Sequence, residues 1–251
     1  MGGGEVMVYE EWKSDYTWSD NGDDTVTITG YSDTATKVVV IPDKLGGMAV
    51  TAIGAEVFWY KGLTSVAIPN GLLTIGYMAF YGNELTRVEI PASVTSIGDS
   101  AFAANELTEV KMEISLDLMS IGNSAFYNNK LARMTIPASV ISIGKAAFSN
   151  NGLIEVEVSP SSNLASIGIS AFSFNKLTVM EIPLSVTSIG YAAFYGNKLN
   201  ELEIPANVAT IGDFAFSENN ITRVIFGGKP SVGEKSFSNR TKDSIRYLAS
   251  L

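Results

Sequence analysis

The stretch Leu85-Thr-Arg-Val-Glu-Ile-Pro-Ala-Ser-Val-Thr-Ser-Ile-Gly-Asp-Ser-Ala-Phe-Ala-Ala-Asn-Glu106 decides the fold, because close copies of it fill most of the chain. A branched residue followed by Gly precedes a phenylalanine in each copy, as Ile97-Gly98 precedes Phe102. Self-similarity at a fixed period of this length predicts a solenoid of stacked coils. The phenylalanines recur every 21 to 24 residues, at Phe58, Phe80, Phe102, Phe126, Phe148, Phe172, Phe194, Phe216 and Phe237.

The pattern within one unit predicts a short strand with one buried face. Arg87-Val88-Glu89-Ile90 alternates polar and apolar residues, which is typical of a half-buried strand. Pro91 ends the pairing because proline has no N–H to donate. Val94, Ile97 and Phe102 are expected to point into the same interior. No unit can bury this apolar set alone, so stacked neighbours must cover it, and their strands form a parallel sheet with about 4.8 Å between strands.

Two further positions of the unit carry structural expectations. Gly98 is expected to permit a turn that a Cβ would strain, and the small Ala101 to allow close contact between coils. An asparagine recurs two residues before each next unit, and we expect an inward ladder that hydrogen-bonds the main chain of adjacent coils. A surface recognition row is the alternative. The asparagines are Asn83, Asn105, Asn129, Asn151, Asn175, Asn197 and Asn219.

Composition excludes several classes of function. The 251 residues include no Cys and no His, which removes Ser-His-Asp and Cys-His catalysis, zinc fingers and His-ligated haem. We therefore expect no cofactor, no transition-metal centre and no disulfide. The net charge of −9 does not suit nucleic-acid phosphates or anionic lipid. No apolar run reaches the roughly 18 residues of a membrane span, so no membrane insertion is expected.

The two ends read as caps. Residues 1–35 are predicted to be an N-terminal cap, with a tag-like start that lacks a signal-peptide pattern and a hairpin turning at Asn21-Gly22. Trp12, Tyr16 and Trp18 are expected to cover the open core of the first coil. Residues 36–237 form about nine coils of 22–24 residues, and residues 238–251 a C-terminal cap or tail in which Ile245-Arg-Tyr-Leu248 closes the stack.

Two units are longer by two residues, between the strand and the Ile-Gly turn. They carry Glu113-Ile-Ser-Leu-Asp117 and Ser159-Pro-Ser-Ser-Asn163. Insertions of this kind bulge outward and either join a binding surface or are tolerated loop variation.

The candidate site is the exposed face of the predicted strands. The third and fifth residues of each unit line it, and ten of them are candidate partner-binding residues: Arg87, Glu89, Glu109, Lys111, Arg133, Glu155, Glu157, Glu181, Glu201 and Glu203. In the first half, Arg87 can pair with Glu109 and Glu89 with Lys111. The last five glutamates predict an acidic field, which would suit a basic partner or a weak Ca²⁺ site. A solvated face that prevents aggregation is the alternative.

Catalysis by two of these glutamates is disfavoured, because glycoside hydrolysis needs a carboxyl with a raised pKa and an open face offers no desolvation. A second candidate surface is formed by tyrosines that flank the Ala-Phe segments and could stack sugars, although singly exposed tyrosines on convex turns are ordinary surface residues. They are Tyr77, Tyr81, Tyr127, Tyr191 and Tyr195.

The unit Leu-x-x-Val-x-Ile-Pro-x-x-Val-x-x-Ile-Gly-x-x-Ala-Phe-x-x-Asn resembles the BspA-like leucine-rich repeat family of bacterial surface proteins, over about residues 25–240. The family's usual unit has Cys where this chain has Asn83 and its equivalents. The resemblance implies a β-dominated α/β repeat, a right-handed leucine-rich-repeat solenoid with a parallel sheet on its concave face.

The same resemblance implies a non-catalytic protein-recognition or adhesion module, extracellular or on the cell surface. We expect a monomer that binds a protein, such as a basic or host matrix protein, through the concave strand face. A carbohydrate-binding module of a larger exported enzyme and a structural spacer are the alternatives.

Overall fold

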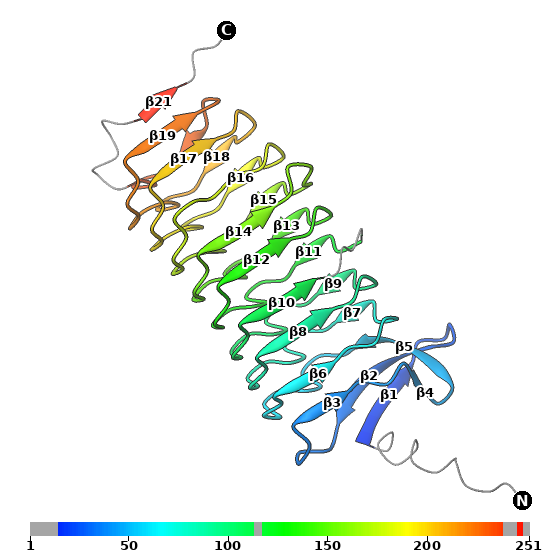
Figure 1. The fold of residues 1–251 in the computed structure, drawn as a ribbon. Coiled ribbons are helices and arrows are strands. Elements are labelled where there is room, and N and C mark those ends of the chain that lie inside the picture. Colours follow the sequence, from blue (N-terminus) through cyan, green and yellow to red (C-terminus); the bar gives the residue numbers. More distant parts are fainter. Residues whose placement is uncertain (1–14, 113–116, 238–244, 248–251) are drawn as a thin grey trace, which may run out of the picture.

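The chain folds into an elongated β-solenoid, which Figure 1 shows as a stack of coils running from one terminus to the other. The structure is a computed structural model that describes residues 15–112, 117–237 and 245–247. No α-helix occurs in these residues, so the expected α/β character is not confirmed and the solenoid is built from strands and turns. Its handedness stays a prediction.

The Ser-Ile dipeptides, which the sequence pattern assigned to turns, form the continuous sheet. Each is a two-residue strand that pairs in parallel with its equivalents one coil away, as Ser120 pairs with both Ser96 and Ser142. Together with the N-terminal strands they make a 12-stranded sheet. These strands are β7 (Thr74–Ile75), β9 (Ser96–Ile97), β11 (Ser120–Ile121), β13 (Ser142–Ile143), β15 (Ser166–Ile167), β16 (Ser188–Ile189), β18 (Thr210–Ile211) and β20 (Ser231–Val232).

The strands predicted at the start of each unit lie on another side of the coils and form separate small sheets. The pairs are β3 with β6, β8 with β10, and β12 with β14, followed by the three-stranded group β17, β19 and β21. Their bounds are β3 (Val38–Val40), β6 (Ser65–Ala67), β8 (Arg87–Ile90), β10 (Glu109–Met112), β12 (Arg133–Ile136), β14 (Glu155–Val158), β17 (Glu201–Ile204), β19 (Arg223–Phe226) and β21 (Ile245–Tyr247). The expected strand at residues 177–182 does not form, so the single sheet predicted here is interrupted.

A ladder of phenylalanine rings fills the core. All nine predicted rings are buried, and successive rings stack with centroids 5.0–5.5 Å apart and interplanar angles of 2–9°. The one-ring-per-coil prediction is therefore confirmed. Each coil adds Leu, Val and Ile side chains around its ring, such as Leu85, Val94 and Ile97.

The asparagine ladder is inward, as predicted. Asn105 Nδ2 donates to the carbonyl oxygen of Phe80 at 2.9 Å and to that of Phe102 at 3.1 Å, and its Oδ1 accepts from the N–H of Leu85. The asparagine of every other unit named above bonds its neighbouring coils in the same way. Buried main-chain groups at the bend of each coil thereby find partners.

The repeated glycine is required for a different reason from the turn that was expected. Gly98 does not have a positive φ; instead, a Cβ built on it would lie 2.7 Å from the main-chain carbon of Gly76 in the preceding coil. The left-handed positions are Ser100 (φ 56°) and Ala104 (φ 54°), two residues after Gly98 and Phe102. Glycine is required because the main chains of successive coils touch at this point.

A β-hairpin covers the N-terminal end, as the Asn21-Gly22 signal predicts. Strand β1 (Tyr16–Asp20) pairs antiparallel with β2 (Thr25–Tyr31), and β2 continues the long sheet through β5 (Met48–Ile53), which also pairs with β4 (Lys44–Leu45). The rings of Tyr16 and Tyr31 cap the ladder at Phe58, with centroids 6.4 and 5.1 Å from it. Trp18 is exposed and does not serve as the lid, and Trp12 lies outside the described residues.

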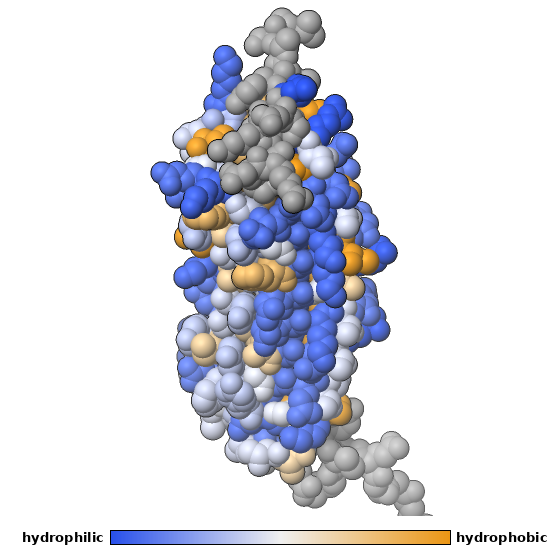
Figure 2. Space-filling model, turned by 90° about the vertical axis from the view of Figure 1, so that its left-hand side faces the viewer, coloured by the Kyte–Doolittle hydropathy of each residue, from blue (hydrophilic) through white to orange (hydrophobic). Residues whose placement is uncertain are grey.

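At the other end the stack continues beyond β17. Strand β21 pairs in parallel with β19, while Leu248 lies outside the described residues. Of the two longer units, Ser159–Asn163 forms a turn, with Ser159 Oγ 2.9 Å from Ser161 Oγ; residues 113–116 of the other lie outside the description. The surface in Figure 2 is mostly hydrophilic with scattered hydrophobic residues, as expected when the apolar set is enclosed by the coils.

Candidate functional site

The candidate site is the strand face, which we define as the outward side chains of β6, β8, β10, β12, β14, β17 and β19 together with residues 177–184. All ten charged residues predicted on it are exposed. The alternation in each strand explains this, because Val88 and Ile90 enter the core and force Arg87 and Glu89 outward.

In the first half of the face, the predicted charge pairs form. Arg87 Nη2 lies 3.0 Å from Glu109 Oε1, and Lys111 Nζ pairs with Glu89. The hydrogen bond from Lys111 holds the pKa of the Glu89 carboxyl below its ordinary value. These carboxylates are therefore already neutralised within the chain.

In the second half, the structure corrects the extent of the acidic field. Glu155 pairs with Arg133, and Glu201 Oε2 lies 3.5 Å from Arg223 Nη1, so two of its five glutamates have basic partners. The prediction of the acidic field considered only bases between Arg133 and Arg223, but each of these arginines stands one unit away from a glutamate at the same position and pairs with it. Glu157, Glu181 and Glu203 form no ion pair within the described part of the chain.

The face is grooved where its strands are not paired. A groove of about 680 Å³ runs between residues 179–184 and β17, and another of about 500 Å³ between β14 and the same segment. A smaller one of about 360 Å³ separates β10 from β12. The larger grooves fall within the 300–1,000 Å³ that is typical of ligand sites, and they contain Glu157, Glu181 and Glu203 on their walls.

The arrangement does not favour metal binding or acid–base catalysis. Within residues 15–112, 117–237 and 245–247, no group of three or more Asp, Glu, His or Cys side chains could hold a metal ion. The Ca²⁺ hypothesis therefore has no geometric support in this part of the chain. The glutamates of the strand face are exposed, so none of them has the buried surroundings of a general acid.

The five tyrosines of the second candidate surface, called the tyrosine edge below, are exposed to different degrees. Tyr77, Tyr127 and Tyr191 are exposed, while Tyr81 and Tyr195 are half-buried beside other aromatic rings. Tyr60 packs on Tyr81 with centroids 5.5 Å apart, and Phe174 packs on Tyr195 at 5.4 Å. Tyr60 and Phe174 were not among the predicted aromatic residues of this edge, although both stand two residues after a core phenylalanine, a position that the sequence shows.

The fold and the strand face define a β-solenoid repeat protein with one open, charged face. The chain belongs to the family of the BspA type leucine rich repeat region, whose model matches residues 51–161 and 119–246. This is a family of leucine-rich-repeat proteins of the bacterial surface, which are generally protein-interaction modules and typically not enzymes.

Two solved structures share the fold. A leucine-rich repeat protein from Bacteroides ovatus has a TM-score of 0.58 and 21% identity, over 93% of this chain and 80% of that one. A leucine-rich repeat protein of T. pallidum has a TM-score of 0.52 and 23% identity, over 92% and 89%. No curated protein matches the chain. In the described residues we find no helix with the length and apolar character needed to cross a membrane.

Proposed function

We propose that this chain is a non-catalytic recognition or adhesion module of a bacterial surface or secreted protein, and that it binds a basic region of a partner protein through the strand face. The observation that carries the proposal is the set of three carboxylates, Glu157, Glu181 and Glu203, which have no ion-pair partner among the described residues on a face whose other glutamates are paired.

The energetics support a role in binding more than one in folding. Like charges on neighbouring strands repel, which costs a few tenths of a kcal/mol per pair on an exposed face. Elsewhere on the strand face an arginine or lysine of the adjacent coil pairs with each glutamate, whereas Glu157, Glu181 and Glu203 have no such partner among the described residues. A basic partner would remove the repulsion on binding, and the field would steer its approach.

The test replaces Glu157, Glu181 and Glu203 with Gln, which keeps their shape and removes their charge. Extracellular matrix proteins of basic and acidic character are passed over the immobilised chain by surface plasmon resonance. We expect basic proteins to bind, and the triple variant to associate roughly tenfold more slowly at low salt with a flatter salt dependence.

The matched control replaces Glu56, Glu84 and Glu218 with Gln, three exposed glutamates outside the strand face. It changes the net charge equally and should leave association close to that of the unaltered chain. Equal binding by the unaltered chain and the strand-face triple variant would refute this face as the docking surface and direct attention to the tyrosine edge.

A further inference from the structure

From β8 to β19, the third position of the unit carries a charged residue in every coil but one. Arg87 pairs with Glu109, Arg133 with Glu155, and Arg223 with Glu201, and each of these ion pairs joins two strands that are also hydrogen-bonded to each other. Val179 occupies the equivalent position in the intervening coil. A valine offers neither neighbour an ion pair, so the coil at residues 177–184 stands between two cross-linked groups of strands.

The main chain of this coil is also unpaired. Val179, Met180, Glu181 and Ile182 make no main-chain hydrogen bond with any other residue that the structure describes. Their neighbours β14 and β17 pair only on their far sides, with β12 and β19. Figure 1 accordingly shows no arrow on this face between β14 and β17. Hydrogen-bonding groups left in this state must be satisfied by water or by a ligand.

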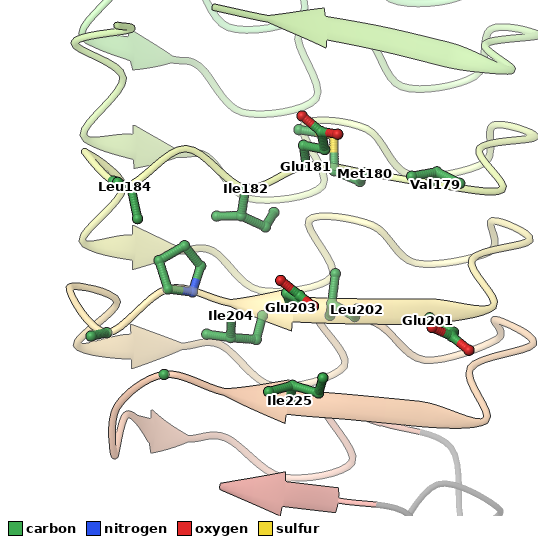
Figure 3. A pocket seen from close by; sticks show the side chains of 13 residues that line it. Val179, Met180, Glu181, Ile182, Leu184, Glu201, Leu202, Glu203, Ile204 and Ile225 are labelled. Atoms are coloured by element: carbon green, nitrogen blue, oxygen red, sulfur yellow. The ribbon is translucent and has the colours of Figure 1, made fainter. Parts of the chain in front are cut away.

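The groove beside the coil combines an aliphatic wall with a charged rim. Val179 is 64% exposed and Leu184 70%, although both are aliphatic, and Ile225 on β19 continues the lining. Figure 3 shows Glu181 on the unpaired segment and Glu203 on the adjacent β17, with aliphatic side chains on both. The lining contains no aromatic ring, which makes it a poor platform for sugars, and its carboxylates repel anions.

We propose that the groove between residues 179–184 and β17 is the docking site for an extended segment of the partner, in which a bulky apolar side chain has a basic one two residues away on each side, so that all three face the groove. This inference rests on the proposed function and gives it a location. The apolar side chain covers Val179 and Leu184. The ammonium or guanidinium groups of the neighbouring basic side chains pair with the rim carboxylates of Glu181 and Glu203. The bound segment lies across the groove and shields from water the N–H and C=O groups of residues 179–182, which have no main-chain partner among the described residues.

The experiment uses a short acetylated and amidated peptide with the repeat Lys-Ser-Leu-Ser, which places lysine and leucine on the same face of an extended chain. It is titrated into the isotopically labelled chain and followed by NMR. We expect shift changes centred on residues 178–184 and 201–206. In the free chain the amides of Val179 to Ile182 should exchange rapidly with solvent, and the peptide should slow them. Slow exchange in the free chain would overturn the proposal, because it would mean that the segment is already paired.

Two control peptides separate the contributions. Replacing the leucines with serines keeps the charge and should weaken binding at least about tenfold. Replacing the lysines with glutamates keeps the apolar part and should abolish binding. Equal binding of the leucine and serine peptides would overturn the groove as the site.

A blocking variant tests the location within the chain. Ala206 is exposed and lines the groove just after Pro205, so Ala206→Trp should fill it without altering a charge. Ala92, also exposed, holds the equivalent place after Pro91 beside the paired strand β8, and Ala92→Trp is the matched control. We expect about tenfold weaker peptide binding in the first and a change within about twofold in the second.

The outcomes distinguish the two proposals. If the Gln triple variant loses binding but Ala206→Trp does not, the charged face is the docking surface and the groove is not, so only this inference fails. If neither variant changes binding of the lysine–leucine peptide, both proposals fail.

Discussion

At the residue scale, repeated positions that look similar in sequence serve different physical purposes. The phenylalanine and asparagine ladders do what their periodicity predicts, because burial and main-chain satisfaction are needed in every coil. The glycine ladder does not: Gly98 allows contact between coils, while Ser100 and Ala104 adopt the left-handed conformation without being glycine. Interactions with adjacent coils hold these residues in a conformation that costs roughly 1 kcal/mol each.

This assignment predicts the effect of Gly98→Ala. Its new Cβ would lie 2.7 Å from the carbon and 3.0 Å from the oxygen of Gly76, and since both are main-chain atoms the coils would have to move apart. We expect a loss of about 1–3 kcal/mol in the free energy of unfolding, measured by urea denaturation. Gly71→Ala is the control, because a Cβ there meets nothing within 4 Å. A stable Gly98→Ala variant would contradict the contact argument.

At the element scale, the N-terminal hairpin covers the first ring of the ladder, where a preceding coil would otherwise stack. Tyr16 and Tyr31 continue the ring ladder beyond Phe58 with their centroids 4.9 Å apart. Burial raises the pKa of both hydroxyls, that of Tyr31 to about 12 from an ordinary 10.0, and the nearby carboxylates of Asp33 and Asp15 add to the shift. The folded cap is therefore more stable when both tyrosine hydroxyls are protonated.

The raised pKa values of Tyr16 and Tyr31 predict how the stability of the cap depends on pH. In the unfolded chain these hydroxyls lose their protons near pH 10, and in the folded chain only at higher pH, so the stability they contribute is complete below pH 10 and is lost as the pH rises toward 12. We expect the hairpin to loosen in this window, seen as tyrosinate absorbance appearing together with faster amide exchange in β1 and β2. The Tyr16→Phe, Tyr31→Phe double variant should lack this response, while the control Tyr191→Phe should keep it. If the double variant responds as strongly as the unaltered chain, the cap is not the origin of the response.

At the scale of the whole molecule, each coil is stabilised by contact with its two neighbours. Phe126 is fully buried between Phe102 at 5.5 Å and Phe148 at 5.4 Å, so a cavity there weakens two interfaces between coils. We expect Phe126→Ala to cost about 3–5 kcal/mol of unfolding free energy by urea denaturation.

The control for that prediction is Phe174→Ala, which removes the same ring from a position that is 58% exposed. Its cost should be about 1 kcal/mol or less, because little apolar surface returns to water. Similar losses in the two variants would mean that the ring ladder does not carry the stability of the stack.

The sequence by itself determined the solenoid, the ring and asparagine ladders, the strands such as Arg87–Ile90 and the outward direction of the ten charged residues. Those features depend on local periodicity and on needs repeated in every coil. The tertiary structure alone decided that the Ser-Ile dipeptides form the long sheet, that Glu155 and Glu201 are neutralised, and that residues 179–182 stand unpaired between two grooves. Such features depend on how closely one coil approaches the next, a distance between chain segments some 22 residues apart that no pattern within a single unit specifies.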